Sequence, residues 1–95
     1  MSPSNLEPQW AAAELLVERQ KYKPAEIQLI QLSKLQSERM RAFRMLAEVA
    51  RLQGDHVKVR LWLRNLYAVM PEEEFAILLL SPLYLPYVDV LDTLR

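Results

Sequence analysis

The sequence of 95 residues contains no cysteine and a single glycine, and both shortages exclude kinds of site. Without cysteine the chain can form neither disulfides nor thiolate metal sites, so nothing in it requires an oxidising compartment. One glycine is too few for a phosphate-cradling loop. We therefore expect a protein of the cytoplasm that does not bind nucleotides through such a loop.

The sequence also lacks a long apolar run. The longest one, from Phe75 to Val88, is interrupted by Ser81, Pro82 and Pro86. It is shorter than the roughly 20 residues that a membrane-spanning helix needs. Because the first ten residues contain neither a basic residue nor an apolar run, we expect no secretory signal there.

What is present indicates one folded, helix-rich domain with a modest core, since 52% of the residues are hydrophobic and 25% are charged. The net charge is zero but uneven along the chain. Between residues 34 and 64, eight basic side chains face three acidic ones, a net charge of +5. The flanking segments are acidic, with −1 before and −4 after it.

Apolar residues recur every three or four positions, which predicts helices and no strands. The expected helices cover about 8–20, 24–36, 37–54 and 55–70, followed by a fifth after Pro71 and a last turn at 87–94. Ser37 and Asp55 are the expected N-caps of the third and fourth helices. The fourth helix is apolar on most of its circumference, so we expect it to be covered on several sides. The predicted fold class is all-α.

An internal repeat emerges when the chain is compared with itself at the shift that aligns the turn residues Gln20 and Gly54. The other matched pairs at this shift are Ala12/Leu46, Ala13/Ala47, Leu16/Ala50, Ala25/Val59, Ile27/Leu61, Leu29/Leu63, Leu32/Leu66 and Leu35/Val69.

A repeat of this length built from two helices resembles the tetratricopeptide repeat, whose period is about 34 residues. The second copy carries the pattern in Phe43, Leu46, Ala47, Gly54, Val59, Leu63 and Pro71. The first copy keeps Ala13, Ala25, Leu29 and Leu32 but has Gln9, Gln20 and Ser37 where the motif prefers an aromatic residue, Gly and Pro. The resemblance implies two tetratricopeptide-like (TPR-like) hairpins, about 6–39 and 40–73, and a capping segment, 74–95. A generic helical bundle is the alternative.

In that family the first helix of each repeat lines a groove that binds another protein. The positions matching it here are Glu7, Trp10, Glu14 and Val17 in the first copy and Arg41, Arg44, Glu48 and Arg51 in the second. Aromatic and arginine side chains are common at binding hot spots. The alternative for the arginine face is a solvated helix side. The apolar segment after Pro71, with Phe75, Leu78 and Leu79, either caps its own chain or is completed by a partner or a second copy.

The run from Ile27 to Leu35 is similar to helices in small TPR-like chaperones of type III secretion. This resemblance implies a non-catalytic adaptor or chaperone that holds an amphipathic helix, such as that of a needle subunit, within a hetero-complex or a homodimer.

No residue pattern indicates catalysis, a cofactor or a metal. His56 is the only histidine, and the adjacent Glu72, Glu73 and Glu74 point in different directions on a helix, where they complement its dipole. The competing function is nucleic-acid binding by a helix-turn-helix drawn from the third and fourth helices. The calculated pI near 6.6 and the acidic flanks argue against it.

Overall fold

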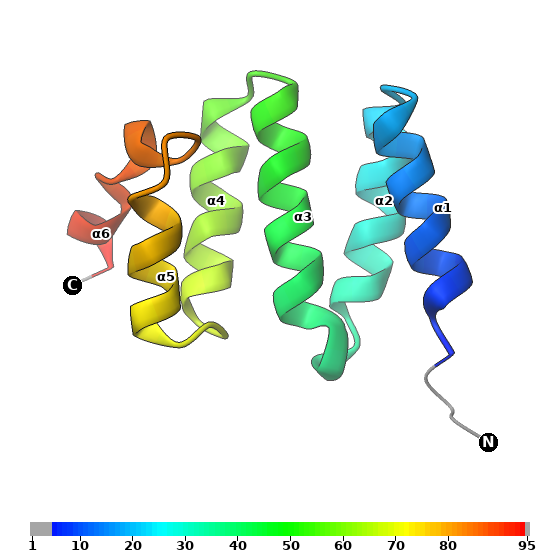
Figure 1. Ribbon diagram of the computed structural model, residues 1–95, viewed down its shortest axis with the longest axis horizontal. Helices are drawn as coiled ribbons and strands as arrows, with labels where there is room; N and C mark the ends of the chain where they lie inside the picture. Colours follow the sequence, from blue (N-terminus) through cyan, green and yellow to red (C-terminus); the bar gives the residue numbers. More distant parts are fainter. Residues whose placement is uncertain (1–4, 95) are drawn as a thin grey trace.

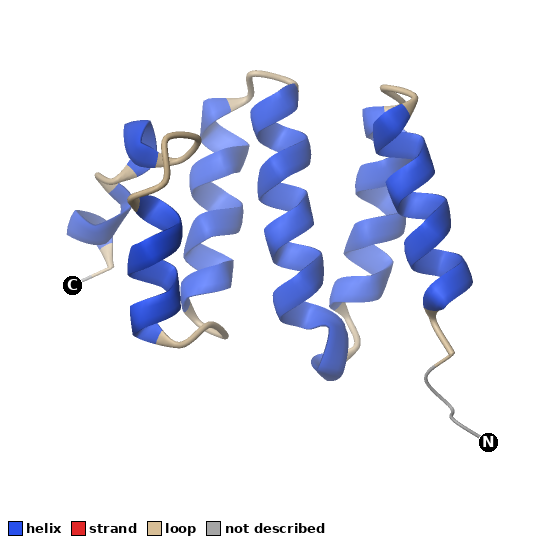
Figure 2. Cartoon of the chain, viewed as in Figure 1, coloured by secondary structure: helices blue, strands red, loops and turns tan. Residues whose placement is uncertain are grey.

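A computed structural model of the protein describes residues 5–94, and within them there is no strand (Figure 1; Figure 2). The elements are α1 (Glu7–Glu18), α2 (Tyr22–Ser33), a 3-10 turn η1 (Gln36–Glu38), α3 (Arg39–Leu52), α4 (His56–Tyr67), α5 (Glu72–Leu79), a second 3-10 turn η2 (Leu85–Tyr87) and α6 (Val90–Thr93). The prediction of an all-α protein is confirmed. The first four helices begin and end within a few residues of the expected positions.

The helices form two layers. In Figure 1, α1, α3 and α5 lie nearer the viewer, and α2 and α4 lie behind them. The first five helices run alternately up and down, and each packs against the next along the chain. Helix α4 also contacts α6. The result is a row of helices measuring 41 × 29 × 18 Å.

Two turns of the same geometry reverse the chain after α1 and after α3. Gln20 and Gly54 have positive φ angles of 60° and 71°. The amide that follows each of them donates to a carbonyl five residues back, Lys21 to Leu16 at 2.8 Å and Asp55 to Ala50 at 3.0 Å. This is the Schellman ending of a helix, which satisfies carbonyls of the last turn. The predicted alignment of Gln20 with Gly54 therefore has a structural counterpart.

The core consists of two clusters that meet at α3. The N-terminal cluster contains Trp10, Ala13, Leu29, Leu32, Ala42, Leu46 and Val49. The C-terminal cluster contains Ala47, Ala50, Val59, Leu63, Leu66, Met70, Phe75, Leu79, Tyr84, Tyr87 and Val90. Phe43 and Trp62 stack with ring centres 5.8 Å apart and pack against both clusters. Small residues on α3, such as Ala42 and Ala47, allow the neighbouring helices to approach it closely.

The segment after Pro71 caps its own chain on one side. Tyr84, Tyr87 and Val90 are buried in the same cluster as Leu63 and Leu66 of α4. The other side of this segment is apolar and exposed, at Ile77, Leu80, Leu83, Leu85 and Val88. The segment therefore caps its own chain, as one alternative expected. It also leaves apolar side chains exposed, so a surface remains that a partner or a second copy could cover.

One local expectation is wrong, and two are confirmed. Ser37 does not cap α3, because the 3-10 turn η1 precedes that helix and the Ser37 hydroxyl donates instead to Glu38. Helix α4 is covered on several sides, by α3, α5 and α6, although Val57 is 78% exposed and Leu61 45% exposed. Asp55 does cap α4, its side chain accepting from the Lys58 amide at 3.1 Å.

None of the helices between residues 5 and 94 is long and apolar enough to cross a membrane.

Candidate functional site

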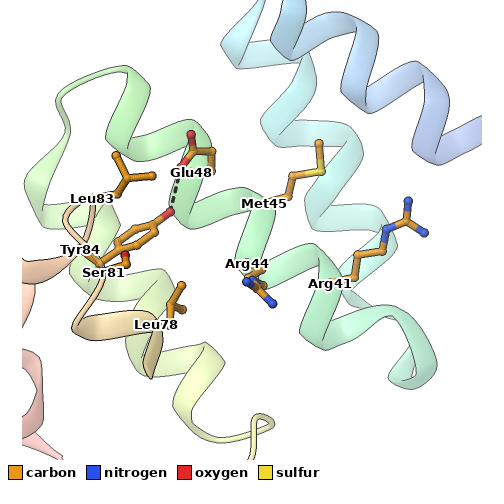
Figure 3. A pocket seen from close by; sticks show the side chains of 8 residues that line it. All are labelled: Arg41, Arg44, Met45, Glu48, Leu78, Ser81, Leu83 and Tyr84. Atoms are coloured by element: carbon orange, nitrogen blue, oxygen red, sulfur yellow. Dashed lines mark hydrogen bonds between the residues drawn. The ribbon is translucent and has the colours of Figure 1, made fainter. Parts of the chain in front are cut away.

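A groove lies between α3 and the segment formed by α5 and the loop after it (Figure 3). Its larger part has a volume of about 500 Å³ and is lined by Arg41, Arg44, Met45, Glu48, Leu78, Ser81, Leu83 and Tyr84. Its smaller part, of about 270 Å³, is lined by Arg44, Met70, Glu74, Ile77 and Leu78. Because both parts share Arg44 and Leu78, they adjoin. We call the two together the α3–α5 groove.

One face of α3 forms a wall of this groove. Arg41, Arg44, Met45 and Glu48 are spaced three, four and seven residues apart, so their side chains lie on the same side of the helix. The opposite wall is mainly apolar, with Leu78 on α5 and Leu83 on the loop after it, and it also carries Glu74 in the smaller part. The site therefore combines an apolar surface with a row of charged groups.

A hydrogen-bonded cluster closes the groove at the Glu48 end. The Glu48 carboxylate accepts from the Tyr84 hydroxyl at 3.0 Å and from Arg51 Nε at 3.0 Å. The bond from Arg51 lowers the pKa of Glu48, and burial raises the pKa of Tyr84. The cluster attaches the loop after α5 to α3. It also neutralises Glu48 locally, because Arg51 forms an ion pair with it.

At its other end the groove is bounded by contacts between α1 and α3. The Arg41 guanidinium lies 3.5 Å from Glu14 and 4.0 Å from Glu7. It also lies over the Trp10 ring, 4.1 Å from the centroid. The two ion pairs are exposed to solvent, so they orient Arg41 more than they stabilise the fold.

Arg44 occupies the middle of the groove and contributes to both of its parts. Its side chain is exposed, and it forms no ion pair with any residue between 5 and 94. Glu74 lines the smaller part with it, but the two do not pair. Arg44 is therefore the basic residue of the groove whose charge the described chain leaves uncompensated by an ion pair.

The structure brings several sequence-predicted site residues together. Arg41, Arg44, Glu48 and Leu78 line the groove. Arg51 lies behind Glu48 and Glu14 lies beside Arg41, each within an ion pair. Val17 is partly buried against the N-terminal core cluster.

Three predicted residues are not on the surface. Trp10, Phe75 and Leu79 are each 1% exposed and belong to the core clusters. Trp10 packs in the N-terminal cluster, and its indole Nε1 donates to Glu38 at 2.7 Å. The expectation that these side chains are exposed to a partner is corrected, because a large apolar group gains more from packing in the core than from facing water.

Sequence reasoning missed Met45, Leu83 and Tyr84. Met45 lies one helical turn after Arg41, so the periodicity of α3 alone could have identified it. Leu83 and Tyr84 reach the groove through an irregular loop after Pro82, for which no periodicity exists.

Outside the groove, His56 is the first residue of α4 and is exposed. Its Nδ1 lies 2.6 Å from the Tyr87 hydroxyl, a contact that helps to hold the C-terminal segment on α4. Among residues 5–94 no group of three or more acidic or histidine side chains is arranged to hold a metal ion.

A comparison of the chain with models of protein families, with curated proteins and with solved structures found no significant match.

Proposed function

We propose that this protein is a non-catalytic adaptor or chaperone that holds a helical segment of another protein in the α3–α5 groove. The observation that carries the proposal is the groove itself: an open surface between α3 and the segment of α5 and its following loop, with mainly apolar side chains on the α5 wall and a row of charged groups on α3. Grooves of this composition are a common way to bind an amphipathic helix.

We infer further that the two hairpins are TPR-like. In support, the turns at Gln20 and Gly54, which the repeat alignment pairs, share their backbone geometry. The aligned pairs Ala13/Ala47, Ala25/Val59, Leu29/Leu63 and Leu32/Leu66 are all buried. The first helices of both hairpins, α1 and α3, lie in one layer with α5.

The two copies differ at several of the aligned groove positions, and Trp10 and Arg44 are the pair that matters most for binding. Trp10 is buried, whereas Arg44, its counterpart in the second copy, is exposed in the groove. The first hairpin therefore contributes less to the proposed docking surface than the second. A groove between α3 and α5 replaces the longer one that the repeat resemblance implied.

Nucleic-acid binding is the less favoured function. Four basic residues of the positive middle segment pair with carboxylates: Arg41 with Glu7 and Glu14, Arg51 with Glu48, Lys58 with Glu26 and Arg60 with Asp89. Most of these carboxylates come from outside that segment. Folding therefore neutralises much of the positive charge that the segment carries in the sequence. Phosphate binding depends on basic groups that remain available to the backbone of a nucleic acid.

The identity of the partner rests on the sequence resemblance alone. It suggests a cytoplasmic co-chaperone of type III secretion that covers the amphipathic helix of a needle subunit. In such a hetero-complex, the groove would shield apolar side chains that otherwise drive polymerisation.

Site-specific photo-crosslinking in the native host tests the function. A photoreactive phenylalanine analogue replaces Leu83, which is 52% exposed in the groove, or Ile27, which is 64% exposed on α2 and outside it. We expect one dominant protein adduct from position 83 and none of that adduct from position 27. Equal yields at both positions, or no adduct at 83, would contradict the proposal.

A further inference from the structure

The charges in the α3–α5 groove are not equally available to a ligand. Glu48 is already paired with Arg51 and accepts from Tyr84. Arg41 is shared between Glu7 and Glu14 of α1. Arg44 has no such partner among residues 5–94 and lies where the two parts of the groove join. Of the groove's charges, Arg44 and, in the smaller part, Glu74 are therefore the two without an ion pair among residues 5–94, and Arg44 provides the available positive charge at the centre.

Apolar side chains surround that charge. Met45 follows Arg44 on α3, and Leu78 and Leu83 lie across from it on the opposite wall. Leu83 is 52% exposed, and Ile77, in the smaller part, is 70% exposed. A ligand with a negative charge between its own apolar groups would cover these apolar side chains and at the same time pair with the Arg44 guanidinium.

The length of the groove limits the ligand. Arg41 and Glu48 are seven residues apart, which at about 1.5 Å per residue is about 10 Å along α3. Two turns of a partner helix have the same length, and its apolar residues at i, i+3 or i+4, and i+7 would fall on one side.

We propose that the α3–α5 groove selects an acidic amphipathic helix, with a partner carboxylate on Arg44 and apolar residues one turn to either side of it. This inference rests on the proposed function and names the chemistry of its partner. Arginine suits this role because its planar guanidinium can bind a carboxylate through two parallel hydrogen bonds.

Glu74 gives the inference a second, independent prediction. It lines the smaller part of the groove beside Arg44, and α5 also carries Glu72 and Glu73 in its first turn. A partner carboxylate on Arg44 is repelled by Glu74, so removing that charge should strengthen binding of an acidic helix. A basic helix should respond in the opposite direction.

Two designed peptides serve as probes for the full chain. Both are labelled amphipathic helices with leucine at the i and i+7 positions; one has glutamate at the i+4 position between the two leucines, and the other has lysine there. We expect the glutamate peptide to bind about tenfold more tightly at low salt in a fluorescence anisotropy titration.

Variants of the protein locate the effect. Arg44→Gln should remove most of the preference for the glutamate peptide, while Glu74→Gln should increase it. Arg19→Gln is the matched control, because Arg19 is exposed at the end of α1, away from the groove, and the substitution changes the net charge equally. Circular dichroism of each variant verifies that the helices are retained.

The outcomes separate this inference from the proposed function. Equal binding of both peptides, an equal effect of Arg44→Gln and Arg19→Gln, or no binding of either peptide would overturn the acidic-helix inference. Such results leave the adaptor function standing if position 83 still forms its specific photo-adduct. Loss of that adduct as well would overturn both.

Discussion

Gln20 and Gly54 hold the same backbone position in the two turns that end α1 and α3. Glycine adopts a positive φ without strain, whereas a residue with a Cβ atom pays for it. We expect Gln20→Gly to stabilise the chain by up to about 1 kcal/mol and Gly54→Ala to destabilise it by about 1 kcal/mol. Urea unfolding followed by circular dichroism measures both changes.

Gln20→Ala is the control for this pair, because alanine removes the side chain but keeps the strain. No atom lies within 4 Å of a Cβ added at Gly54, so the cost of Gly54→Ala arises from the backbone and not from a clash. Equal stability of Gln20→Gly and Gln20→Ala would refute the backbone explanation.

The cluster of Glu48, Arg51 and Tyr84 predicts how stability depends on pH. The pKa of Glu48 is lowered from 4.5, chiefly by the hydrogen bond from Arg51, so its contribution is present above pH 4.5 and is lost as the pH falls below that value. We expect Glu48→Gln to be less stable than the original chain at pH 7 and to lose less stability on acidification. Thermal melts between pH 3 and pH 7 provide the measurement.

Tyr84 gives the opposite dependence on the alkaline side. Burial raises its pKa from 10.0, so the stability linked to the neutral hydroxyl is present below pH 10 and is lost as the pH rises above it. Tyr84→Phe keeps the ring but removes the hydroxyl, and it should cost about 1 kcal/mol at neutral pH. Its stability should also fall less than that of the original chain above pH 10; a parallel fall would argue against this assignment.

Trp10 provides a test of core packing. It is 1% exposed, and its indole donates to Glu38. Trp10→Ala should cost about 3 to 5 kcal/mol, because it leaves a large cavity in the N-terminal cluster. Ile27→Ala, at a position 64% exposed, should cost less than about 0.5 kcal/mol. Chemical unfolding measures the free energy of unfolding of both variants. Similar values for the two substitutions would contradict the burial of Trp10 in the N-terminal cluster.

The C-terminal segment is needed to complete the core. Ending the chain after Pro71 removes Phe75, Leu79, Tyr84, Tyr87 and Val90 and uncovers the apolar side of α4 that they bury. We expect this truncation to aggregate or to lose its cooperative unfolding transition. A soluble monomer with the melting behaviour of the full chain, judged by size-exclusion chromatography and calorimetry, would show that the cap is dispensable.

The sequence was sufficient for the helices and for one wall of the groove. Apolar periodicity placed the helices, and the spacing of Arg41, Arg44 and Glu48 put them on one face of α3. Periodicity did not tell whether Trp10 faces a partner or the core, because a helix face has the same spacing in both cases. The conformation of the loop that carries Leu83 and Tyr84 could not be predicted from the sequence either. Its path depends on tertiary contacts such as the hydrogen bond from Tyr84 to Glu48.

Helix α3 supplies side chains to both core clusters, through residues such as Ala42 and Ala47, and its outer face forms a wall of the groove. Neither hairpin therefore has a hydrophobic core of its own. We expect the whole molecule to unfold in one cooperative transition. A ligand seated against α3 would then protect every helix, including α2 and α6, which do not line the groove, from hydrogen exchange through global opening. Binding of a ligand to the groove would therefore be detectable as slower hydrogen exchange of backbone amides far from it.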